Sequence, residues 1–585
     1  MAERKFQTPE VPRFEREFFE PGKPLTRIGD GSIGGKTQGL AFARDLLASE
    51  FGHEFEDVDI AVPTLTVLGT DIFDSFMRSN GLHEISLSGD PDDRIAHAFQ
   101  QAELPVEVVG DLRAVVERVH SPLAVRSSSL LEDAMFRPFA GVYETKMTPN
   151  NQPDPATRFR RLLEAIKYVY ASTYFGAAKD YIRATDEDPR SEKMAVIIQE
   201  VVGTRHGDRF YPDLSGVCRS YDYYPTGRTR PEEGVVNLAL GLGKAIVDGG
   251  VVWSYCPARP RKPPPFGSTR DLLRNTQTTF WSVNMGQITE YDPIAETEYL
   301  SKHDLAAADY DNTLRLVAST YDAQSDRLSP GVGVRGPRVL NFAPLLGMNS
   351  FGFNDLLRRL LAACEGATGT PVEIEFAMTF PHAAGRERAR LGFLQVRPMV
   401  VSDTEVDVSD VEISARDALV ASTRVMGNGT DESIRDIVYV KPDVFDARHT
   451  RVIAQELQQM NAALLAEGRP YLLIGFGRWG SSDPWLGIPV VWGQICGARA
   501  IVEATLPNML VDPSQGSHFF HNISNFQVSY FTVREGDGTG NVDFGWLAGQ
   551  AFAYDTEFVR HVRLDESLLV KVDGRTGRGV ILRRA

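Results

Sequence analysis

The sequence predicts a mixed α/β protein built from more than one domain. The chain has 585 residues, of which 42% are hydrophobic and 24% are charged. This length exceeds what one hydrophobic core organises, and the composition is that of a globular protein. Segments with strand character alternate with segments that carry a helical stripe. Together these three observations predict several units that combine sheets and helices.

The first elements expected along the chain are a glycine-rich loop and the helix that follows it. In "GSIGGKTQGL" (31–40), glycines precede Lys36, and apolar residues continue at helical spacing beyond it. Backbone N–H groups and a lysine at the start of a helix can bind phosphate. The segment is not a Walker A motif, because Asp30 occupies the position of that motif's first glycine. A capping loop with a solvated lysine is the alternative interpretation.

The elements that follow alternate between strands and helices. Apolar runs and period-2 alternation predict the strands, and apolar stripes at helical spacing predict the helices. Strands are expected within 58–69 (interrupted at Pro63), 121–129, 193–202 and 234–252, helices at 70–81, 156–184 and 355–367, and a Pro/Arg-rich loop at 257–275. Arg126 precedes three serines, whose hydroxyls suit phosphate contact. A polar loop around an arginine with ordinary partners is the alternative.

The segments "PVEIEFAMTF" and "RLGFLQVRPMV" are predicted to pair as an antiparallel hairpin. Strand side chains alternate, so Glu373 and Glu375 share one face, as do Gln395 and Arg397. Carboxylate and amide oxygens suit Mg²⁺, and the planar fork of an arginine suits phosphate oxygens. The hairpin can therefore form a metal- and phosphate-binding site. Taken alone, it favours the alternative, a Glu375–Arg397 cross-strand ion pair with no further role.

Charge and composition argue against several classes of protein. The net charge of -16 gives no support to general nucleic-acid binding, which usually shows a basic footprint. The four cysteines are widely separated and form no C-x-x-C pair, so neither a zinc site nor a disulfide framework is suggested. No leader peptide and no window of membrane-spanning length is visible. We therefore expect a cytoplasmic protein with no membrane association.

The ordered set of these stretches resembles the nucleotide-binding domain of pyruvate phosphate dikinase and phosphoenolpyruvate synthase. The matching stretches are "IGGKTQGL", "VPTLTVLGTDIFDSFMRSNGL", "LAVRSSSLLED", "FAGVYET", "AIKYVYASTY", "MAVIIQEVV", "SGVCRS", "LGLGKAIVDG", "EIEFAM" and "FLQVRPMV". They cover about residues 27–400, roughly two thirds of the chain. The resemblance implies an ATP-grasp fold, in which ATP lies between two α/β lobes.

The resemblance also implies roles for the motif residues. Lys36 and Arg126 would contact the phosphates of ATP. Glu375 and Gln395 would hold Mg²⁺, and Arg397 would contact the phosphoryl group that is transferred. The resemblance therefore implies that the polar face of the hairpin binds a metal–nucleotide complex.

A further stretch, "IIQEVV", is implied to be the strand beside the adenine, with Gln199, Glu200 and Val202 close to the base. Two departures from the family pattern concern the same region. Lys244 in "GLGK" replaces the acidic residue of the family's "GLGE", which bears on ribose contacts or on the acceptor. The stretch around Arg219, "SGVCRSYDYYPTG", lacks the family's usual "GVLFTRDP" wording.

An acidic segment, "VSDTEVDVSD" (401–410), is the expected linker to the rest of the chain. Beyond it, apolar runs such as "DIVYV", "PYLLIGF", "GIPVVWG" and "NFQVSYFTV" predict strands of another α/β unit. The expected architecture is therefore a two-lobed ATP-grasp module followed by a smaller α/β C-terminal domain. The expected divisions are an N-terminal lobe at 1–205, a lobe carrying the hairpin at 206–402, and the C-terminal domain at 403–585.

The family's swivelling phosphohistidine domain and its substrate barrel are not expected here, because 185 residues follow position 400 and such a barrel needs about 250. His518 in "DPSQGSHFFHNIS" follows Gly-Ser and is a candidate phosphate carrier. The surrounding wording differs from the family's, which favours a structural histidine. Arg478 in "IGFGRWGSSDPWLGIPV" lies either in a loop that binds an anionic or aromatic ligand or in a tight loop around a buried tryptophan.

The functional expectation is an ATP- and Mg²⁺-dependent phosphotransferase of the dikinase type, without the barrel for pyruvate or phosphoenolpyruvate. Its partners would be ATP and an unidentified phosphoryl acceptor, either a histidine such as His518 or another molecule. Two alternatives of other classes remain. One is a nucleotide-binding regulatory or scaffold protein with little catalysis, and the other is an ATP-grasp ligase that activates a carboxylate.

Overall fold

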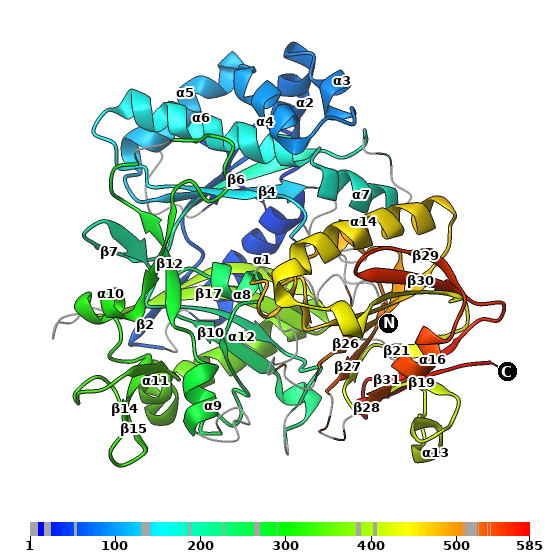
Figure 1. Cartoon of the computed structure of the whole chain (residues 1–585). Helices are drawn as coiled ribbons and strands as arrows, with labels where there is room; N and C mark the ends of the chain where they lie inside the picture. The colour runs from blue at the N-terminus through cyan, green and yellow to red at the C-terminus, as the bar shows by residue number, and fades with distance from the viewer. Residues whose placement is uncertain are drawn as a thin grey trace.

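The structure is a computed structural model, and its mixed α/β architecture confirms the predicted fold class (Figure 1). It describes residues 10–16, 25–51, 55–129, 141–184, 188, 190–225, 229–262, 269–288, 291–381, 388–399, 401, 406–481, 483–506, 509, 523, 526–534, 536, 538 and 540–584. Among these residues, no helix combines the length and the apolar character that crossing a membrane requires.

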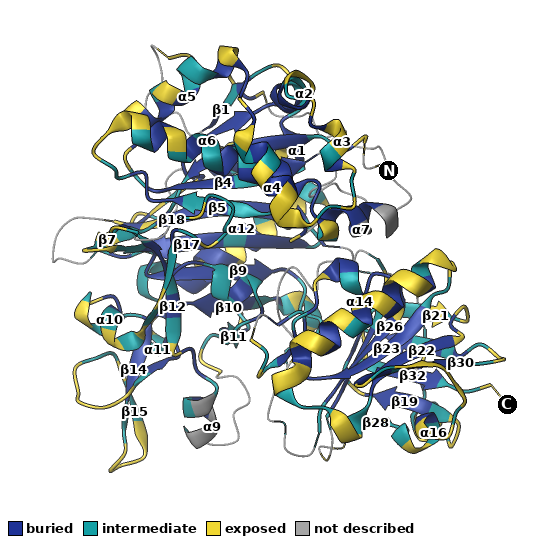
Figure 2. Cartoon of the chain, turned by 45° about the horizontal axis from the view of Figure 1, so that its top comes forward, coloured by how far each residue is buried: buried dark blue, intermediate teal, exposed yellow. Residues whose placement is uncertain are grey.

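A five-stranded sheet forms the first layer of the molecule, with strand order β1-β3-β6-β4-β5. Its strands are β1 Leu25–Ile28, β3 Leu65–Leu68, β6 Met194–Glu200, β4 Leu123–Ser129 and β5 Thr145–Thr148. One face is covered by the helices α2 to α6 (Figures 1 and 2). The helices of this part are α2 Thr70–Ser79, α3 His83–Ser86, α4 Asp92–Gln101, α5 Val106–Arg118, α6 Pro155–Ser172 and α7 Gly176–Ala184.

A six-stranded sheet forms a second layer, with strand order β11-β10-β9-β17-β18-β2. Its strands are β11 Trp253–Tyr255, β10 Val235–Ala239, β9 Leu214–Arg219, β17 Val372–Thr379, β18 Ala389–Pro398 and β2 Val58–Ala61. Pro63 separates β2 from β3, as predicted, and the two strands join different sheets. β2 runs parallel to β18, so a strand from early in the chain completes a sheet formed mostly by residues beyond 213.

Helix α1, Gly34–Glu50, lies between the two sheets and packs against β4, β6, β18 and β2. Its apolar residues share one core with α12, Phe353–Thr368, and with the facing surfaces of both sheets. A second core joins the other face of the five-stranded sheet to helices α2–α7 and continues into the C-terminal part of the chain. Figure 2 shows the buried strands between the exposed outer surfaces of the helices.

Two small antiparallel sheets extend the second layer. One has the order β13-β12-β8-β7 and the other β15-β14-β16. Their strands are β7 Thr204–His206, β8 Arg209–Tyr211, β12 Thr279–Asn284, β13 Leu300–Asp304, β14 Ala318–Asp322, β15 Arg327–Pro330 and β16 Arg338–Leu340. The short helices here are α8 Lys244–Val247, α9 Thr269–Arg274, α10 Leu305–Tyr310 and α11 Ala343–Met348, with 3-10 turns at Pro231–Glu233 and Ser350–Gly352.

The C-terminal part is built on a seven-stranded sheet, β20-β27-β26-β23-β22-β30-β29, in which β22, β23, β26 and β27 are parallel. A five-stranded sheet, β21-β31-β32-β19-β28, and the pair β24-β25 accompany it. The strands are β19 Ala418–Ser422, β20 Val425–Met426, β21 Asn428–Asp431, β22 Asp436–Val440, β23 Tyr471–Phe476, β24 Arg478–Trp479, β25 Gly487–Ile488, β26 Ala498–Ala504, β27 Ser529–Val533, β28 Gly540–Val542, β29 Phe552–Asp555, β30 Val559–Arg563, β31 Leu569–Asp573 and β32 Arg578–Leu582.

Helix α14 lies along one face of the seven-stranded sheet (Figure 2). The helices of this part are α13 Asp410–Ile413, α14 Thr450–Ala466 and α16 Phe544–Ala548, with 3-10 turns at Pro442–Val444, Ala447–His449 and Trp492–Gln494. The strand expected at 487–493 ("GIPVVWG") is shorter than predicted, because β25 covers only Gly487–Ile488 and a 3-10 turn begins at Trp492. The predicted divisions at 205/206 and 402/403 stay predictions.

The expected helical region at 156–184 and the start of α2 each show a local feature. The helical region at 156–184 is divided, because residues 173–175 form turns between α6 and α7. The N-cap of α2 is Gly69, and Asp71 makes no cap. Instead, the Asp71 carboxylate accepts hydrogen bonds from the backbone N–H groups of Asp30 and Gly31, both at 2.9 Å. Asp71 thus fastens the glycine-rich loop that precedes α1.

Candidate functional site

The predicted hairpin forms, and its polar residues face one another as expected. Glu373 lies directly opposite Arg397, and Glu375 lies directly opposite Gln395. The register shifts just after Glu375, which is a β-bulge. A bulge leaves backbone groups outside the regular ladder, and here the Leu394 carbonyl accepts a hydrogen bond from a side chain instead. The structure thereby brings two carboxylates, an amide and a guanidinium to one face of the six-stranded sheet.

Arg397 is the centre of a buried network of charges. Its Nε donates to Glu373 Oε1 at 2.7 Å, and its Nη2 contacts the Glu375 carboxylate. On the far side, Arg219 Nε donates to Glu373 Oε2 at 2.6 Å. The side chains of Arg397 and Glu373 are each only 1% exposed. A buried charge of this kind requires charged partners, and each of these groups has them.

Glu373 is a site residue that the sequence-based prediction did not include. The sequence signal was present, because Glu373 stands two positions before Glu375 on the same strand face. The cross-strand ion pair raised as the alternative does form, but Glu373 rather than Glu375 lies directly opposite Arg397. The geometry is thus a network of several charges instead of a single pair.

Arg126 connects the two large sheets. It comes from β4 in the five-stranded sheet, and its Nη2 donates to Gln395 Oε1 at 2.8 Å. Its Nη1 donates to the Leu394 carbonyl at 3.0 Å and to Gln199 Oε1 at 3.3 Å. The same guanidinium lies 3.8 Å from Glu375 Oε2. One arginine of β4 thus contacts both Gln395 and Glu375 of the hairpin, the two residues predicted to hold Mg²⁺.

The N-terminus of α1 meets the same strand. Ser128 lies on the face of β4 that carries Arg126, and its hydroxyl accepts from Thr37 N at 3.1 Å. Gly34 has φ +73°, and a Cβ there would lie 1.7 Å from the Ser128 carbonyl oxygen. The glycine is therefore required for this close approach. The N-cap residue, Ile33, makes no side-chain hydrogen bond to the helix, and Lys36 in the first turn is buried.

The residues expected near adenine occupy different environments. Gln199 is buried on β6 and accepts from Arg126, while its Nε2 is buried with no hydrogen-bond partner among the described residues. The Glu200 N–H donates to Thr64 O at 2.9 Å, and its side chain is half-buried. Val202 is buried against Gly392 of β18. This stretch thus passes from one large sheet to the other.

Lys244 lies in a cluster of charged groups, formed by α8 and by the segments before β13 and β5. Its Nζ is 3.3 Å from Asp248 and 3.4 Å from Glu296. Burial opposes the charge of Lys244, but the two carboxylates outweigh burial and raise its pKa. Glu144, next to β5, faces the same group. Burial, and then the negative charge of Glu296, raises the pKa of Glu144 to about 7.

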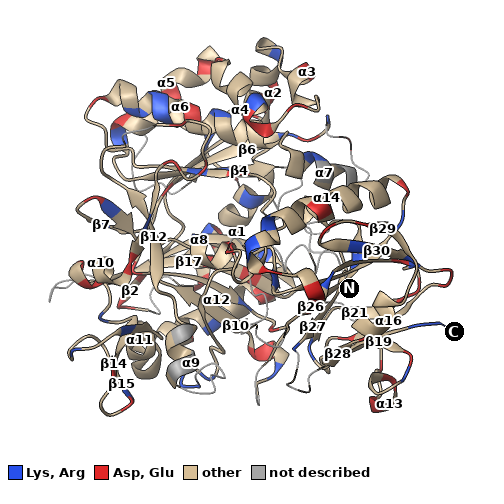
Figure 3. Ribbon diagram, in the orientation of Figure 1, with Lys and Arg blue, Asp and Glu red and all other residues tan. Residues whose placement is uncertain are grey.

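A loop from the second layer also reaches the first layer at Lys146. The Lys146 ammonium donates to the carbonyl oxygens of Pro293 at 2.5 Å and Ala295 at 2.8 Å. Burial lowers the pKa of this lysine to about 8. Figure 3 shows acidic and basic residues side by side around α1, α8 and β17. The two layers are thus joined by polar contacts at more than one point.

The described residues contain no group of three or more His, Cys, Asp or Glu side chains arranged for a metal ion. Mg²⁺ does not demand such a group, because it usually takes one or two carboxylates and completes its shell with phosphate and water. Glu375 and Gln395 both present an oxygen to the same cationic nitrogen of Arg126. They therefore converge on a position that a cation can occupy, and the donor set fits Mg²⁺.

The remaining predicted residues lie elsewhere. His518 falls outside the described residues. Trp479 is fully buried and donates to Val502 O at 3.1 Å, which matches a tight loop around a tryptophan. The neighbouring Arg478 donates to the Gly249 carbonyl at 3.0 Å. The guanidinium is therefore used in a contact with the segment that follows α8.

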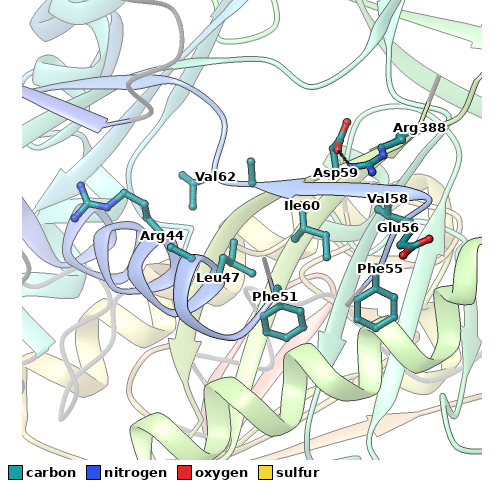
Figure 4. A pocket seen from close by; sticks show the side chains of 12 residues that line it. Arg44, Leu47, Phe51, Phe55, Glu56, Val58, Asp59, Ile60, Val62 and Arg388 are labelled. Carbon is teal, nitrogen blue, oxygen red and sulfur yellow. Dashed lines mark hydrogen bonds and ion pairs between the residues drawn. The ribbon is translucent and has the colours of Figure 1, made fainter. Parts of the chain in front are cut away.

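A pocket of about 450 Å³ lies away from the charged network (Figure 4). It is lined by Leu47 and Phe51 of α1, by Phe55, and by β2 residues such as Ile60. Leu47 lies in the last turn of α1 and Phe51 is its C-cap, whereas Lys36 is at the start of this helix. The pocket is mostly apolar on the side of the helix and contains none of the predicted site residues.

Comparison with known proteins matches a large part of the chain to a family. A family model described as the pyruvate phosphate dikinase AMP/ATP-binding domain matches residues 30–417. A rifampicin phosphotransferase of Streptomyces sviceus is 30% identical over 170 residues, covering 27% of this chain and 18% of that protein. A phosphoenolpyruvate synthase of Aeropyrum pernix is 26% identical over 241 residues, covering 37% and 26%.

An uncharacterised phosphotransferase of Bacillus subtilis, YvkC, is 26% identical over 192 residues, covering 33% of this chain and 21% of that protein. The matches thus span only about a fifth to a quarter of the relatives' own lengths. The family model, in contrast, matches about two thirds of this chain and includes every described candidate residue of the hairpin, β4, β6 and α1. The chain belongs to the pyruvate phosphate dikinase AMP/ATP-binding domain family.

Proposed function

We propose that this chain is an ATP- and Mg²⁺-dependent phosphotransferase of the dikinase and phosphoenolpyruvate synthase type. The observation that carries the proposal is the position of Arg126, which joins β4 to Gln395 and Glu375 of the hairpin. Residues separated by about 270 positions in sequence meet there in one charged site. Such convergence serves the binding of a compact, highly charged ligand better than it serves stability, because burying charged groups costs desolvation energy that can exceed the Coulombic gain of pairing them.

The charge balance of the site suits a triphosphate. Arg126, Arg219 and Arg397 surround two carboxylates, and Lys36 lies at the adjoining helix start. The cluster is locally positive in a chain whose net charge is -16. Arg397 and Arg126 would neutralise the charge that develops on the transferred phosphoryl group, which is the main source of catalysis in such reactions. Backbone N–H groups at the start of α1 would add to phosphate binding.

Glu375 and Gln395 are the residues proposed to hold Mg²⁺. When bound, the ion would neutralise phosphate charge and orient the triphosphate. Gln199 supports the proposed adenine position, because its buried Nε2 has no partner among the described residues and can donate to a ring nitrogen. Glu200 and Val202 would then lie along the base, in the stretch that passes between the sheets.

The acceptor is either a histidine of this chain, with His518 as the candidate, or a separate molecule. In either case the acceptor's nucleophilic atom forms a bond to phosphorus as the nucleotide oxygen leaves. Attack on the β-phosphorus displaces AMP and places the β- and γ-phosphoryl groups on the enzyme, from which the γ-phosphoryl group then passes to water as inorganic phosphate. Attack on the γ-phosphorus transfers the γ-phosphoryl group alone and displaces ADP. The matched relatives named phosphotransferase and phosphoenolpyruvate synthase support this class of reaction.

Incubation of the purified protein with Mg²⁺ and ATP labelled separately at the β and γ positions tests the proposal. AMP together with acid-labile label on the protein supports a phosphohistidine, and H518A would then abolish labelling. ADP without labelled protein directs the search to a small-molecule or protein acceptor. Absence of turnover by the parent protein, with and without candidate acceptors, contradicts the proposed activity.

One observation favours a second candidate, a nucleotide-binding regulatory protein. The Glu375 carboxylate already pairs with Arg397, and the Gln395 amide oxygen already pairs with Arg126. A site whose metal ligands are paired in this way can bind nucleotide and turn it over slowly. Tight ATP binding without any product in the labelling experiment would favour this candidate.

A further inference from the structure

Arg478 makes a long-range contact that the proposed reaction does not yet explain. It belongs to β24 in the C-terminal part of the chain and is largely buried. Its Nη1 donates to Gly249 O at 3.0 Å and lies 3.4 Å from Gly250 O. A buried guanidinium needs acceptors for its N–H groups, and here backbone carbonyls 228 or more positions away serve as acceptors. The contact therefore fixes the C-terminal part against the segment that follows α8.

That segment is a tight turn with little freedom of its own. The Gly250 N–H donates to Ala245 O at 2.8 Å, and Gly249 has φ +69°. A Cβ at Gly250 would lie 2.8 Å from the same Ala245 oxygen, so the turn closes directly on the helix. Its outer carbonyls are the groups that Arg478 binds. Holding these carbonyls holds the whole turn, because the chain between them and α8 is only a few residues long.

The other end of the segment reaches the proposed nucleotide site. Ile246 of α8 packs on Val217 of β9, and Val217 lies directly opposite Glu375. Lys244, at the start of α8, is the cation that interacts with Glu296 across the charged cluster. Lys244 lies beside the proposed site, so a shift of the turn would displace it.

Arg478 is itself firmly held. The next residue, Trp479, is fully buried, and a Cβ at Gly475 would lie 2.4 Å from its ring. The C-terminal part also contacts the first layer, because Phe526 packs edge-on against Tyr181 of α7 and stacks on Trp492. The C-terminal part is thus anchored to both layers between which the candidate site lies.

We infer that Arg478 is a positioning residue, through which the C-terminal domain holds the 244–250 segment and Lys244 in place for ATP binding. This inference rests on the proposed function. It gives residues 403–585 a role in nucleotide affinity that does not require them to carry the phosphoryl acceptor. It also accounts for the loop around Arg478, because this arginine contacts Gly249 of the nucleotide-binding module.

Hydrogen–deuterium exchange and ATP binding, measured on the full chain, test the inference. In R478A, peptides that cover 244–252 should exchange on the order of ten times faster, because hydrogen bonds to a charged group are lost. Peptides that cover 372–398 should be unchanged. The dissociation constant for ATP with Mg²⁺, measured by calorimetry, should rise on the order of tenfold. R478K keeps the charge without the fork and should be intermediate.

The matched control is R448A, because Arg448 is exposed in the same part of the chain and, among the described residues, its ion pair is the local one with Asp446. It should change neither measurement. Unchanged exchange at 244–252 in R478A overturns the inference, as does faster exchange with unchanged ATP affinity. If the parent protein does not bind ATP, the proposed function fails and the inference fails with it. The parent measurement therefore separates the two failures.

A second route applies if R478A does not fold. K244Q removes the cation at the other end of the segment, and R478K can be measured in both backgrounds. If Arg478 acts through Lys244, the affinity lost in R478K should largely disappear in the K244Q background. Equal losses in the two backgrounds would overturn the inference.

Discussion

Two buried networks of acidic and basic groups lie in different parts of this molecule and are built from the same residue types. One joins Glu373 and Arg397 in the hairpin of the six-stranded sheet. The other joins Asp436 to His561 at 2.7 Å and to Arg469 at 2.6 Å in the seven-stranded sheet. Residue type alone does not distinguish a functional network from a structural one. The difference must come from which parts of the molecule each network connects.

The Asp436 network stays within the C-terminal part of the chain, where Arg563 and Arg469 also contact Glu467. Asp436 is buried on β22, and its partners come from β30 and from the loop before β23, which are the strands on either side. Arg563 adds a third contact at 3.2 Å. Burial by itself would raise the pKa of Asp436, but the hydrogen bonds from His561, Arg469 and Arg563 outweigh burial and lower it. Such a network stabilises neighbouring strands.

The hairpin network is open at one end. It begins at the buried Arg219 and passes through two carboxylates and Arg397. It ends at Arg126, which belongs to the other large sheet and whose side chain is 14% exposed. Arg219 also has a buried Nη2 without a partner among the described residues. The comparison indicates two distinguishing features of the candidate site. Its charged groups link two sheets, and a buried N–H donor of Arg219 has no partner among the described residues.

The largest expected effect is that of R397A. Two buried carboxylates lose their shared partner, so the free energy of unfolding should fall by about 3–5 kcal/mol. ATP turnover should fall on the order of 10³-fold or more, as for other arginines that face a transferring phosphoryl group. Denaturant unfolding and product assays measure the two effects. Turnover close to that of the parent would show that the hairpin network is structural, like the Asp436 network.

D436N should show the opposite pattern. The amide keeps the size of the side chain but weakens three charged hydrogen bonds, so unfolding should become easier by about 2–3 kcal/mol. ATP affinity per folded molecule should stay within about twofold of the parent, because Asp436 contacts no residue of the candidate site. A large loss of ATP affinity in protein verified as folded would remove the distinction between the two networks.

The R126A variant should lower ATP turnover strongly while changing the free energy of unfolding only slightly. Turnover should fall about 10²–10³-fold if Arg126 faces the phosphates. The free energy of unfolding should change by about 1 kcal/mol, because the side chain is partly exposed and its partners include neutral amides. R358A is a suitable control, since Arg358 pairs with Asp355 on the exposed face of α12. Equal turnover in R126A and R358A would refute the assigned role.

The smallest effect expected is a change in the pH dependence of stability. The pKa of Glu144 is raised to about 7 from an ordinary value of 4.5, so the folded state holds this proton more tightly than the unfolded state does. The contribution is present below about pH 4.5 and is lost as the pH rises through about 7. E144Q should therefore flatten the fall in melting temperature between pH 4.5 and pH 7.

For Asp436 the sign is reversed. Its pKa lies below the ordinary value of 3.8, so its stabilising contribution is present above that value and is lost as the pH falls further. Melting curves of D436N should diverge least from the parent at the most acid pH. If E144Q and D436N changed stability over the same pH range, the two environments would not differ as described.

Much of the hairpin could be predicted from sequence, because it depends on local patterns. Period-2 alternation places Glu373 and Glu375 on one face, and it places Gln395 and Arg397 on the matching face. The helix start at Lys36 and the strand that contains Arg126 and the three serines are likewise local features. The prediction of a helical region at 156–184 was wrong in one respect, because nothing in its apolar stripe indicates the turns between α6 and α7.

The rest depends on contacts between distant segments, which no local pattern encodes. The pairing of Arg219 with Glu373 joins positions 154 residues apart, and the contact of Arg478 with Gly249 joins positions 229 apart. The four-stranded and three-stranded sheets at 204–340 were not predicted, since their short strands contain mixed apolar and polar residues. The roles of the site residues remain predictions that the experiments above decide.

The place of β2 at the edge of the six-stranded sheet has a consequence for how the chain acquires its structure. Residues 58–61 leave the ribosome early, yet their partner β18 ends at Pro398. Until that strand is synthesised, the edge of β2 has no neighbour and can pair with other chains. A truncated fragment ending near residue 205 should therefore aggregate, whereas one extending past residue 417 keeps the pair together. The late closure of this sheet also implies slow folding, since long-range strand pairing must precede it.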